Sequence, residues 1–113
     1  MNSKFVSELE GKDLDYLVCK ALGWVLVGDA WIDNYGNYIT DEEFYPSTEW
    51  EDGGTLIESE HIGLDYLDKE DLWIANMDSG YRTYLGKTPL LAAMRTFVAS
   101  KFGDVVVINA KIK

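Results

Sequence analysis

The sequence predicts an α+β fold, in which an antiparallel β-meander of three or more strands is packed by a long C-terminal helix and flanked by an N-terminal helix. Residues 12–22 and 88–103 carry apolar side chains at helical spacing. Residues 62–85 hold three β-prone runs separated by short turns. With 113 residues, of which 47% are hydrophobic, the chain 1–113 is expected to form one domain with its own core.

The C-terminal helix is the most completely specified element. Thr88 is a suitable N-cap, and Pro89 fits the first helical position, where a missing N–H costs nothing. Gly103 can take the left-handed conformation that ends a helix. One apolar stripe is expected, formed by Leu90, Leu91, Met94, Phe97, Val98 and Phe102. We expect the meander to bury this stripe, because no other predicted element is large enough.

The N-terminal helix is expected to end at Gly23. Its apolar positions are Leu14, Leu17, Val18, Ala21 and Leu22. Cys19 lies beside this face and is interpreted as a core or boundary residue rather than a nucleophile. As the single cysteine it cannot form an internal disulfide, which indicates a reducing compartment.

The middle of the chain is predicted from its β-prone runs and turn residues. A hairpin is expected over residues 30–40, around the turn signal 34–37, inside a hairpin-like acidic insert over residues 24–45. Residues 47–54 are expected to form a loop or short turn. Residues 55–61 are expected to form a short helix.

The meander is predicted from alternating apolar residues. Its expected strands are 62–67, 72–77 and 81–85, with turns at 68–71 and 78–80. Such short connections imply antiparallel pairing. Residues 105–113 form a β-prone tail, and its first part, 105–108, either adds an edge strand or remains a tail.

The net charge of −10 is concentrated in the middle of the chain. Residues 29–71 carry fourteen acids and one base, whereas residues 72–113 carry two acids and six bases. A field this negative repels nucleic acid and raises encounter rates with basic protein surfaces. The alternative is that the acids only keep a small protein soluble. A membrane is not an expected partner either, because no apolar run approaches the roughly 18–20 residues that span a bilayer.

No motif for catalysis, metal binding or phosphate binding is complete, and no cofactor is expected. His61, the single histidine, has no predicted nucleophile beside it, and the adjacent Glu58 and Glu60 would not point one way with it. A calcium-loop register centred on Gly36 places two aromatic residues at ligand positions. Gly53 and Gly54 lack the lysine of a phosphate-binding loop.

Trp50 is the more informative residue, because it lies in an acid-rich stretch where local burial is hard to arrange. An exposed tryptophan ringed by carboxylates is a plausible protein-binding hot spot. The alternative is that Trp50 tucks against the first helix and pins the loop. The candidate partner-binding residues are Asp41, Glu42, Glu43, Glu49, Trp50, Glu51 and Asp52.

Three blocks of the sequence resemble the NinX-like family of small bacteriophage and prophage proteins, whose function is unknown. The blocks are Gly11–Gly23, Pro46–Trp50 with Gly53, Gly54 and Leu56–Glu58, and Gly86–Asp104. They occur in the family's order and cover nearly half the chain, and the last block is the most specific. Residues 24–45, which are longer and more acidic than the family pattern, and the tail after Asp104 depart from it. The resemblance implies a phage origin and a host-cytoplasm setting, and it supplies no catalytic residues.

The function expected from these observations is that of a small acidic, non-enzymatic phage accessory protein in the host bacterial cytoplasm. It would bind a host or phage protein with a basic surface, for example inhibiting a host nucleic-acid-handling or defence protein in the manner of an anti-CRISPR. One alternative is a small-ligand-binding protein or enzyme with a pocket near the Trp50 loop. Another is a minor virion or assembly component. The oligomeric state is not predicted.

Overall fold

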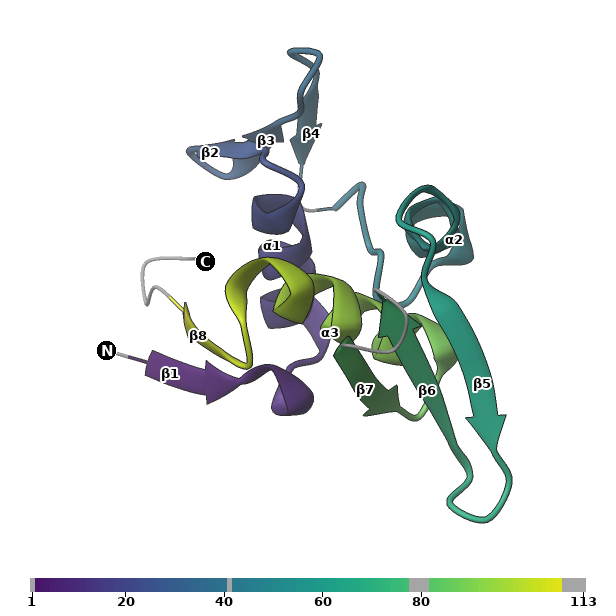
Figure 1. The fold of residues 1–113 in the computed structure, drawn as a ribbon. Coiled ribbons are helices and arrows are strands. Elements are labelled where there is room, and N and C mark those ends of the chain that lie inside the picture. The colour runs from purple at the N-terminus through teal and green to yellow at the C-terminus, as the bar shows by residue number, and fades with distance from the viewer. Residues whose placement is uncertain (1, 41, 78–81, 109–113) are drawn as a thin grey trace.

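The computed structural model describes residues 2–40, 42–77 and 82–108, and these residues form an α+β fold arranged around helix α3 (Figure 1). The elements in chain order are β1 (Asn2–Phe5), η1 (Val6–Glu8), α1 (Gly11–Ala21), β2 (Val25–Val27), β3 (Ala30–Ile32), β4 (Tyr38–Thr40), α2 (Trp50–Ser59), β5 (Gly63–Leu67), β6 (Leu72–Met77), β7 (Arg82–Gly86), α3 (Pro89–Phe102) and β8 (Val105–Ile108). The predicted fold class is confirmed: an antiparallel meander is packed by the C-terminal helix, and an N-terminal helix is present.

Helix α3 begins and ends where the sequence predicts. The Oγ1 of Thr88 accepts a hydrogen bond from the N–H of Leu91 at 3.1 Å, and Pro89 occupies the first turn. Gly103 follows the last turn with a φ of 87°, a left-handed value that glycine adopts without strain. Because both ends are capped by local residues, the sequence alone sets the length of this helix.

The predicted apolar stripe on α3 is confirmed in part, because most of its residues are buried, but the burial extends around the helix beyond one stripe. Its buried residues are Leu90, Ala92, Ala93, Met94, Thr96, Phe97, Val98 and Ala99. Phe102, which was expected on the stripe, is 39% exposed. Three of the buried residues are alanines, and such small side chains let neighbouring elements approach the helix closely from directions that a count of large apolar residues overlooks.

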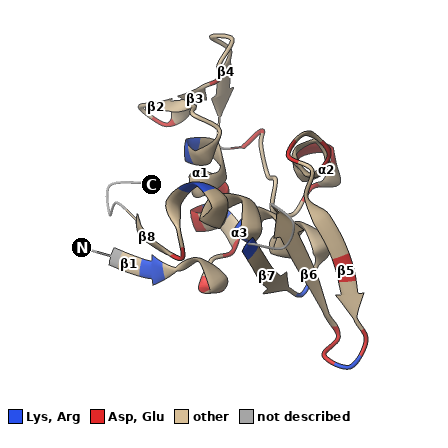
Figure 2. Ribbon diagram, viewed as in Figure 1, with Lys and Arg blue, Asp and Glu red and all other residues tan. Residues whose placement is uncertain are grey.

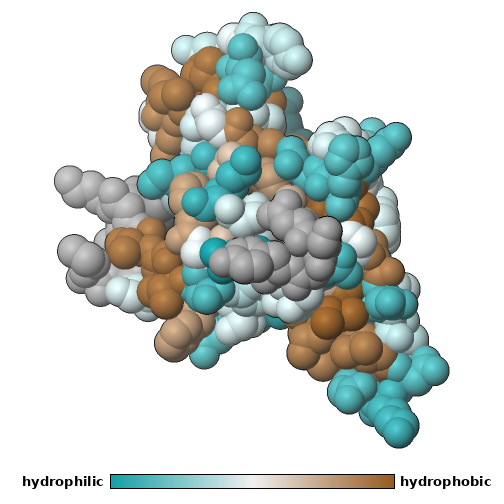
Figure 3. Space-filling model, in the orientation of Figure 1, coloured by the Kyte–Doolittle hydropathy of each residue, from teal (hydrophilic) through white to brown (hydrophobic). Residues whose placement is uncertain are grey.

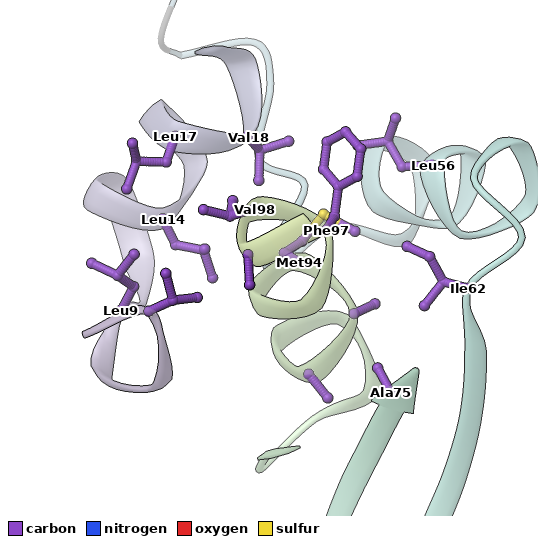
Figure 4. Close-up of a cluster of buried hydrophobic side chains, with 14 of the residues drawn as sticks. Leu9, Leu14, Leu17, Val18, Leu56, Ile62, Ala75, Met94, Phe97 and Val98 are labelled. Carbon is purple, nitrogen blue, oxygen red and sulfur yellow. The ribbon is translucent and has the colours of Figure 1, made fainter. Parts of the chain in front are cut away.

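Two layers therefore enclose α3 rather than one. On the sheet side, the Oγ1 of Thr96 donates to the carbonyl of Ala75 in β6 at 3.3 Å. On the other side the helix meets α1 and α2: Val98 points toward α1, and Phe97 points toward Leu56 of α2 (Figure 4). The expectation that the meander alone covers this helix is corrected, since the two other helices share the core with it.

The meander has the strand order β5-β6-β7, and both pairs are antiparallel as predicted. Ala75 of β6 lies opposite Leu64 of β5 on one side and opposite Tyr84 of β7 on the other. All three side chains are on the face that packs against α3. The predicted turn at 78–80 and the predicted first strand residue, Tyr81, lie outside the described residues.

The predicted hairpin over residues 30–40 is confirmed as β3 paired with β4, and β2 adds a third antiparallel strand. Asp33 organises the turn, because its Oδ1 accepts hydrogen bonds from the backbone N–H groups of Asn37 at 2.8 Å and Tyr35 at 2.9 Å. These bonds, that from Asn37 foremost, hold the pKa of Asp33 below its usual value. Trp31 of β3 anchors the small sheet on α1, because its ring packs against that of Tyr16 with 5.2 Å between the ring centroids.

The predicted loop over residues 47–54 is wrong from residue 50 onward, because α2 begins at Trp50 rather than at residue 55. Two glycines inside a short segment predict a break, but Gly53 lies in the helix for a packing reason. A Cβ at this position would stand 2.2 Å from the carbonyl oxygen of Pro46 and 2.6 Å from Cδ2 of Leu90. Tertiary packing therefore overrides the low helix propensity of glycine here.

Strand β8 resolves the alternative left open for residues 105–108, since it pairs antiparallel with β1. The β1 strand was missed, because Asn2–Phe5 has no alternating pattern of its own. The backbone N–H of Val6 donates to the carbonyl of Asp104 at 2.8 Å, which closes the ribbon at one end. The rest of the predicted tail, residues 109–113, lies outside the described residues.

Candidate protein-binding surface

Trp50 is the first residue of α2, and its side chain is 56% exposed. Its ring lies over Gly54 one turn later, where a Cβ would come within 3.2 Å of the ring atom Cε3. The ring therefore rests on its own helix, and the alternative that Trp50 packs against the first helix is not what the structure contains. Because Gly54 has no side chain, the Trp50 ring can lie flat against the helix, and the rest of the ring remains exposed to solvent.

The predicted acidic residues around Trp50 divide into two groups. Glu42, Glu49 and Glu51 are exposed. Asp52 is half-buried instead, and its Oδ2 accepts a hydrogen bond from the N–H of Tyr45 at 2.8 Å. Glu43 is exposed, but its Oε1 accepts from the N–H of Thr40 at 2.8 Å. The remaining candidate, Asp41, lies outside the described residues.

The segment that leads into α2 is fixed to the body of the protein by a second carboxylate. The Oδ1 of Asp15 in α1 accepts a hydrogen bond from the N–H of Ser47 at 2.9 Å. Partial burial raises the pKa of Asp15, and the nearby charge of Asp52 acts in the same direction, against the hydrogen bond from the Ser47 N–H. Pro46 is fully buried beside this contact. Asp15 and Asp52 thus hold the connection 45–49 from two helices, which gives Trp50 a defined position.

The charge around α2 is one-sided. No lysine or arginine occurs between Lys20 and Lys69 in the sequence. Figure 2 shows acidic residues along the connection from β4 and on α2 itself, without a basic residue among them. None of the described acids within residues 29–71 forms an ion pair with a described cation. Glu51 and Asp52 also stabilise α2 directly, because negative charge is favourable in the first turn of a helix.

Other candidate residues have structural positions. Cys19 is 4% exposed, and burial, aided by the charge of Asp15, raises its pKa to about 12, which disfavours the thiolate near neutral pH. His61 is exposed and follows α2 with a φ of 55°. Within the described part of the chain, no group of three or more histidine, cysteine, aspartate or glutamate residues could hold a metal ion.

A hollow of about 230 Å³ lies away from Trp50, where the ends of α1 and α3 meet β8. Its lining consists of Leu17, Lys20, Phe102, Val105, Val106 and Val107. Lys20 is the single charged residue in that lining, so the hollow offers no carboxylate for acid–base chemistry. None of the helices in the described residues is sufficiently long and apolar to span a membrane.

Comparison with protein families tests the resemblance to the NinX-like family that the three sequence blocks indicate. The family model described as bacteriophage P22, NinX matches residues 5–101. The chain belongs to this family. A search of curated proteins found no matching relative.

The NinX match extends from the end of β1 into the last turn of α3. It therefore includes α1, helix α2 with Trp50, and the meander. It also runs through the acidic residues 24–45. Strand β8 lies beyond the matched range, in agreement with the departure of the tail from the family pattern.

Sequence reasoning missed one residue with a structural role. Arg95 of α3 is not among the candidate residues from the sequence, and the structure places it in a half-buried position. Its Nε donates to the carbonyl of Leu9 at 2.9 Å, and its Nη1 donates to the carbonyl of Leu85 in β7 at 2.7 Å. Arg95 therefore joins the segment before α1 to the meander. Its sequence neighbours Met94 and Thr96 are both buried. In a helix that is enclosed on several sides, such a position indicates that the arginine between them is at least partly buried.

Proposed function

We propose that this NinX-family protein is a phage accessory protein that acts by binding another protein rather than by catalysis. The observation that carries the proposal is the exposed Trp50, whose ring lies over Gly54 and whose neighbours in sequence, Glu49 and Glu51, are exposed acids. Large aromatic side chains that are held in place dominate protein-binding energies, because ordering them on binding costs little further entropy.

The proposed partner has a basic surface. The exposed carboxylates of Glu42, Glu49 and Glu51 face no described cation of their own chain, so they are available to lysine and arginine side chains of another protein. The net charge of −10 accelerates the encounter with such a surface and disfavours direct binding to nucleic acid. Basic grooves that hold nucleic acid have the complementary charge.

We infer that the partner is a host or phage protein that handles nucleic acid, and that binding inhibits it in the host bacterial cytoplasm. A defence protein is one such target, and the mode of action would then be that of an anti-CRISPR or a similar inhibitor. Rigid carboxylates occupy a groove that would otherwise bind phosphates, which is why an acidic protein of this size can act without an active site.

A tagged pull-down from infected host lysate tests the proposal. The bound proteins are washed at low and then at moderate salt and identified by mass spectrometry. We expect a basic nucleic-acid-handling protein that is released by moderate salt, because contacts between exposed charges are screened within about 8–10 Å at such ionic strengths.

The pull-down is repeated with the charge-reversal variant Glu49→Lys/Glu51→Lys, which leaves the structural Asp52 intact. The matched control is Glu8→Lys/Asp29→Lys, which makes the same change in net charge at exposed positions outside α2. The first variant is expected to lose the partner and the control to retain it. Equal capture by both variants, or capture that is insensitive to salt, contradicts the proposal.

A further inference from the structure

The two faces of the β5-β6-β7 sheet differ in what covers them. One face packs against α3: the carbonyl of Ala75 accepts from Thr96, and a Cβ on Gly86 would stand 2.5 Å from the backbone nitrogen of Ala92. Side chains alternate between faces along each strand, so the neighbours of Ala75 and Gly86 in sequence point to the opposite side.

The opposite face carries a continuous apolar strip, formed by Leu67, Leu72, Ile74 and Leu85 and referred to below as the open sheet face. Leu67 lies opposite Leu72, and Ile74 lies opposite Leu85. Leu72 and Ile74 are two residues apart on the central strand, so the two pairs are neighbours on the same face. Leu85 is 41% exposed, and the other three are partly exposed. Figure 3 shows hydrophobic surface over β6 and β7 on this side of the molecule.

Acidic groups border this apolar strip. Asp65 lies opposite Ile74 on the open sheet face, and among the described strand residues it is the one charged side chain there. The turn that follows β5 adds Asp68, Glu70 and Asp71 against Lys69. Lys87 at the end of β7 is a further base, which leaves the acids in excess.

We propose that the open sheet face docks an amphipathic helix of a partner protein, with an apolar stripe flanked by lysine or arginine. A sheet covered by a helix on one face is completed by a helix on the other, the arrangement in which both apolar faces are buried. The basic flank meets Asp65 and the acidic turn. A second copy of the chain is a poorer occupant, because a face-to-face pair would bring two acid-bordered faces together.

This inference goes beyond the proposed function, because it concerns a separate surface and a different kind of contact. The surface around Trp50 is proposed to meet a basic surface of any shape, whereas the open sheet face selects a helix by its apolar stripe. Substitutions of Leu85 and Ile74 change no charge, so they leave the electrostatics around α2 unaltered. The failure of one proposal therefore does not imply the failure of the other.

The test uses a fluorescent designed peptide of about 18 residues, roughly five helical turns, with a leucine stripe and lysine flanks. A peptide of the same composition, scrambled so that the stripe is lost, is the control ligand. Fluorescence anisotropy measures binding to the full chain. We expect the striped peptide to bind about tenfold or more tightly than the scrambled one, because only the former buries apolar area on the sheet.

Variants of the protein then locate the site. Ile74→Thr/Leu85→Thr is expected to reduce the affinity for the striped peptide by about tenfold or more, since both apolar contacts are lost. Val25→Thr/Val27→Thr removes two apolar side chains that are exposed on β2, at 60% and 50%, and it is expected to leave the affinity unchanged. Leu85→Thr alone, at an exposed position, serves if the double variant does not fold. Asp65→Lys is expected to lower the affinity for the lysine-flanked peptide and to raise the affinity for a glutamate-flanked one.

Three results overturn the inference. Equal binding of the striped and scrambled peptides would mean that charge alone, and not the apolar stripe, drives the interaction. Loss of affinity in the Val25/Val27 variant, with none in the Leu85 variants, places the binding elsewhere. Dimerisation of the wild-type protein that Leu85→Thr abolishes, measured by analytical ultracentrifugation, assigns the face to a second copy.

Discussion

Gly53→Ala is predicted to destabilise the protein, although the same change in an ordinary helix interior stabilises it by about 1 kcal/mol. The reason is the contact between α2 and the chain that precedes it. A Cβ at residue 53 would stand 2.2 Å from the carbonyl oxygen of Pro46, which is backbone, and 2.6 Å from Cδ2 of Leu90. Neither neighbour can give way easily, because Pro46 and Leu90 are both buried.

The magnitude follows from two opposing effects. Overpacking of a close-packed site costs about 1–3 kcal/mol, and a contact this short with backbone lies at the upper end of that range. Subtracting the gain of about 1 kcal/mol in helix propensity leaves a net loss of about 1–2 kcal/mol. At roughly 4 °C per kcal/mol for a domain of this size, Tm should fall by about 4–8 °C.

Gly54→Ala is the matched control, since it lies in the same helix and has the same propensity gain. Its Cβ would meet only the Trp50 ring, at 3.2 Å, and that side chain is exposed and able to shift. Its Tm should stay unchanged or rise by up to about 4 °C. Thermal unfolding followed by circular dichroism measures both variants. A Gly53→Ala protein as stable as the wild type, or shifts of the same sign in both variants, would refute the packing argument.

Three further predictions concern buried groups. Arg95→Met should lower the free energy of unfolding by about 2 kcal/mol, because the carbonyls of Leu9 and Leu85 lose a charged donor. Urea denaturation measures this loss, and an unchanged midpoint would contradict the stabilising role of Arg95. Cys19, with a pKa of about 12, should react with a thiol reagent at pH 8 on the order of a thousandfold more slowly in the native protein than in denaturant; comparable rates would show that the thiol is accessible. Asp15 has a raised pKa in the folded state, so its ionisation opposes folding and stability should fall as the pH rises from 3.8 through the folded pKa. Relative to wild type, Asp15→Asn should therefore gain stability over that interval in urea titrations, and a constant difference across the pH range would argue against the raised pKa.

The elements that could be predicted from the sequence are those specified by local residues. Thr88, Pro89 and Gly103 set the ends of α3, and the hairpin follows from the turn that Asp33 and Gly36 organise. These signals act over a few residues and depend little on the rest of the fold.

The elements that could not be predicted depend on contacts distant in sequence. Strand β1 exists because β8, about a hundred residues later, pairs with it. Helix α2 begins early because Gly53 fits against Pro46 and Leu90. The burial of Arg95 depends on carbonyls from two other segments. Periodicity within one segment does not contain such information.

The candidate surface shows the same division. Composition alone identifies the acidic stretch and the tryptophan within it. It does not separate Glu49 and Glu51, which are exposed, from Asp52, which holds the N–H of Tyr45. That distinction is visible only when the connection 45–49 is placed between α1 and α2, and it determines which acids can be substituted without disturbing the fold.

The most direct test of the account is the affinity of the captured partner, measured by isothermal titration calorimetry at low and moderate salt for wild type, Glu49→Gln/Glu51→Gln and Trp50→Ala. We predict that the wild-type affinity falls as salt rises and that the glutamine variant binds more weakly with a smaller salt dependence. Trp50→Ala should cost about 2 kcal/mol or more of binding energy while leaving Tm nearly unchanged. Equal affinities for all three proteins, with no effect of salt, would contradict the claim that this surface binds the partner.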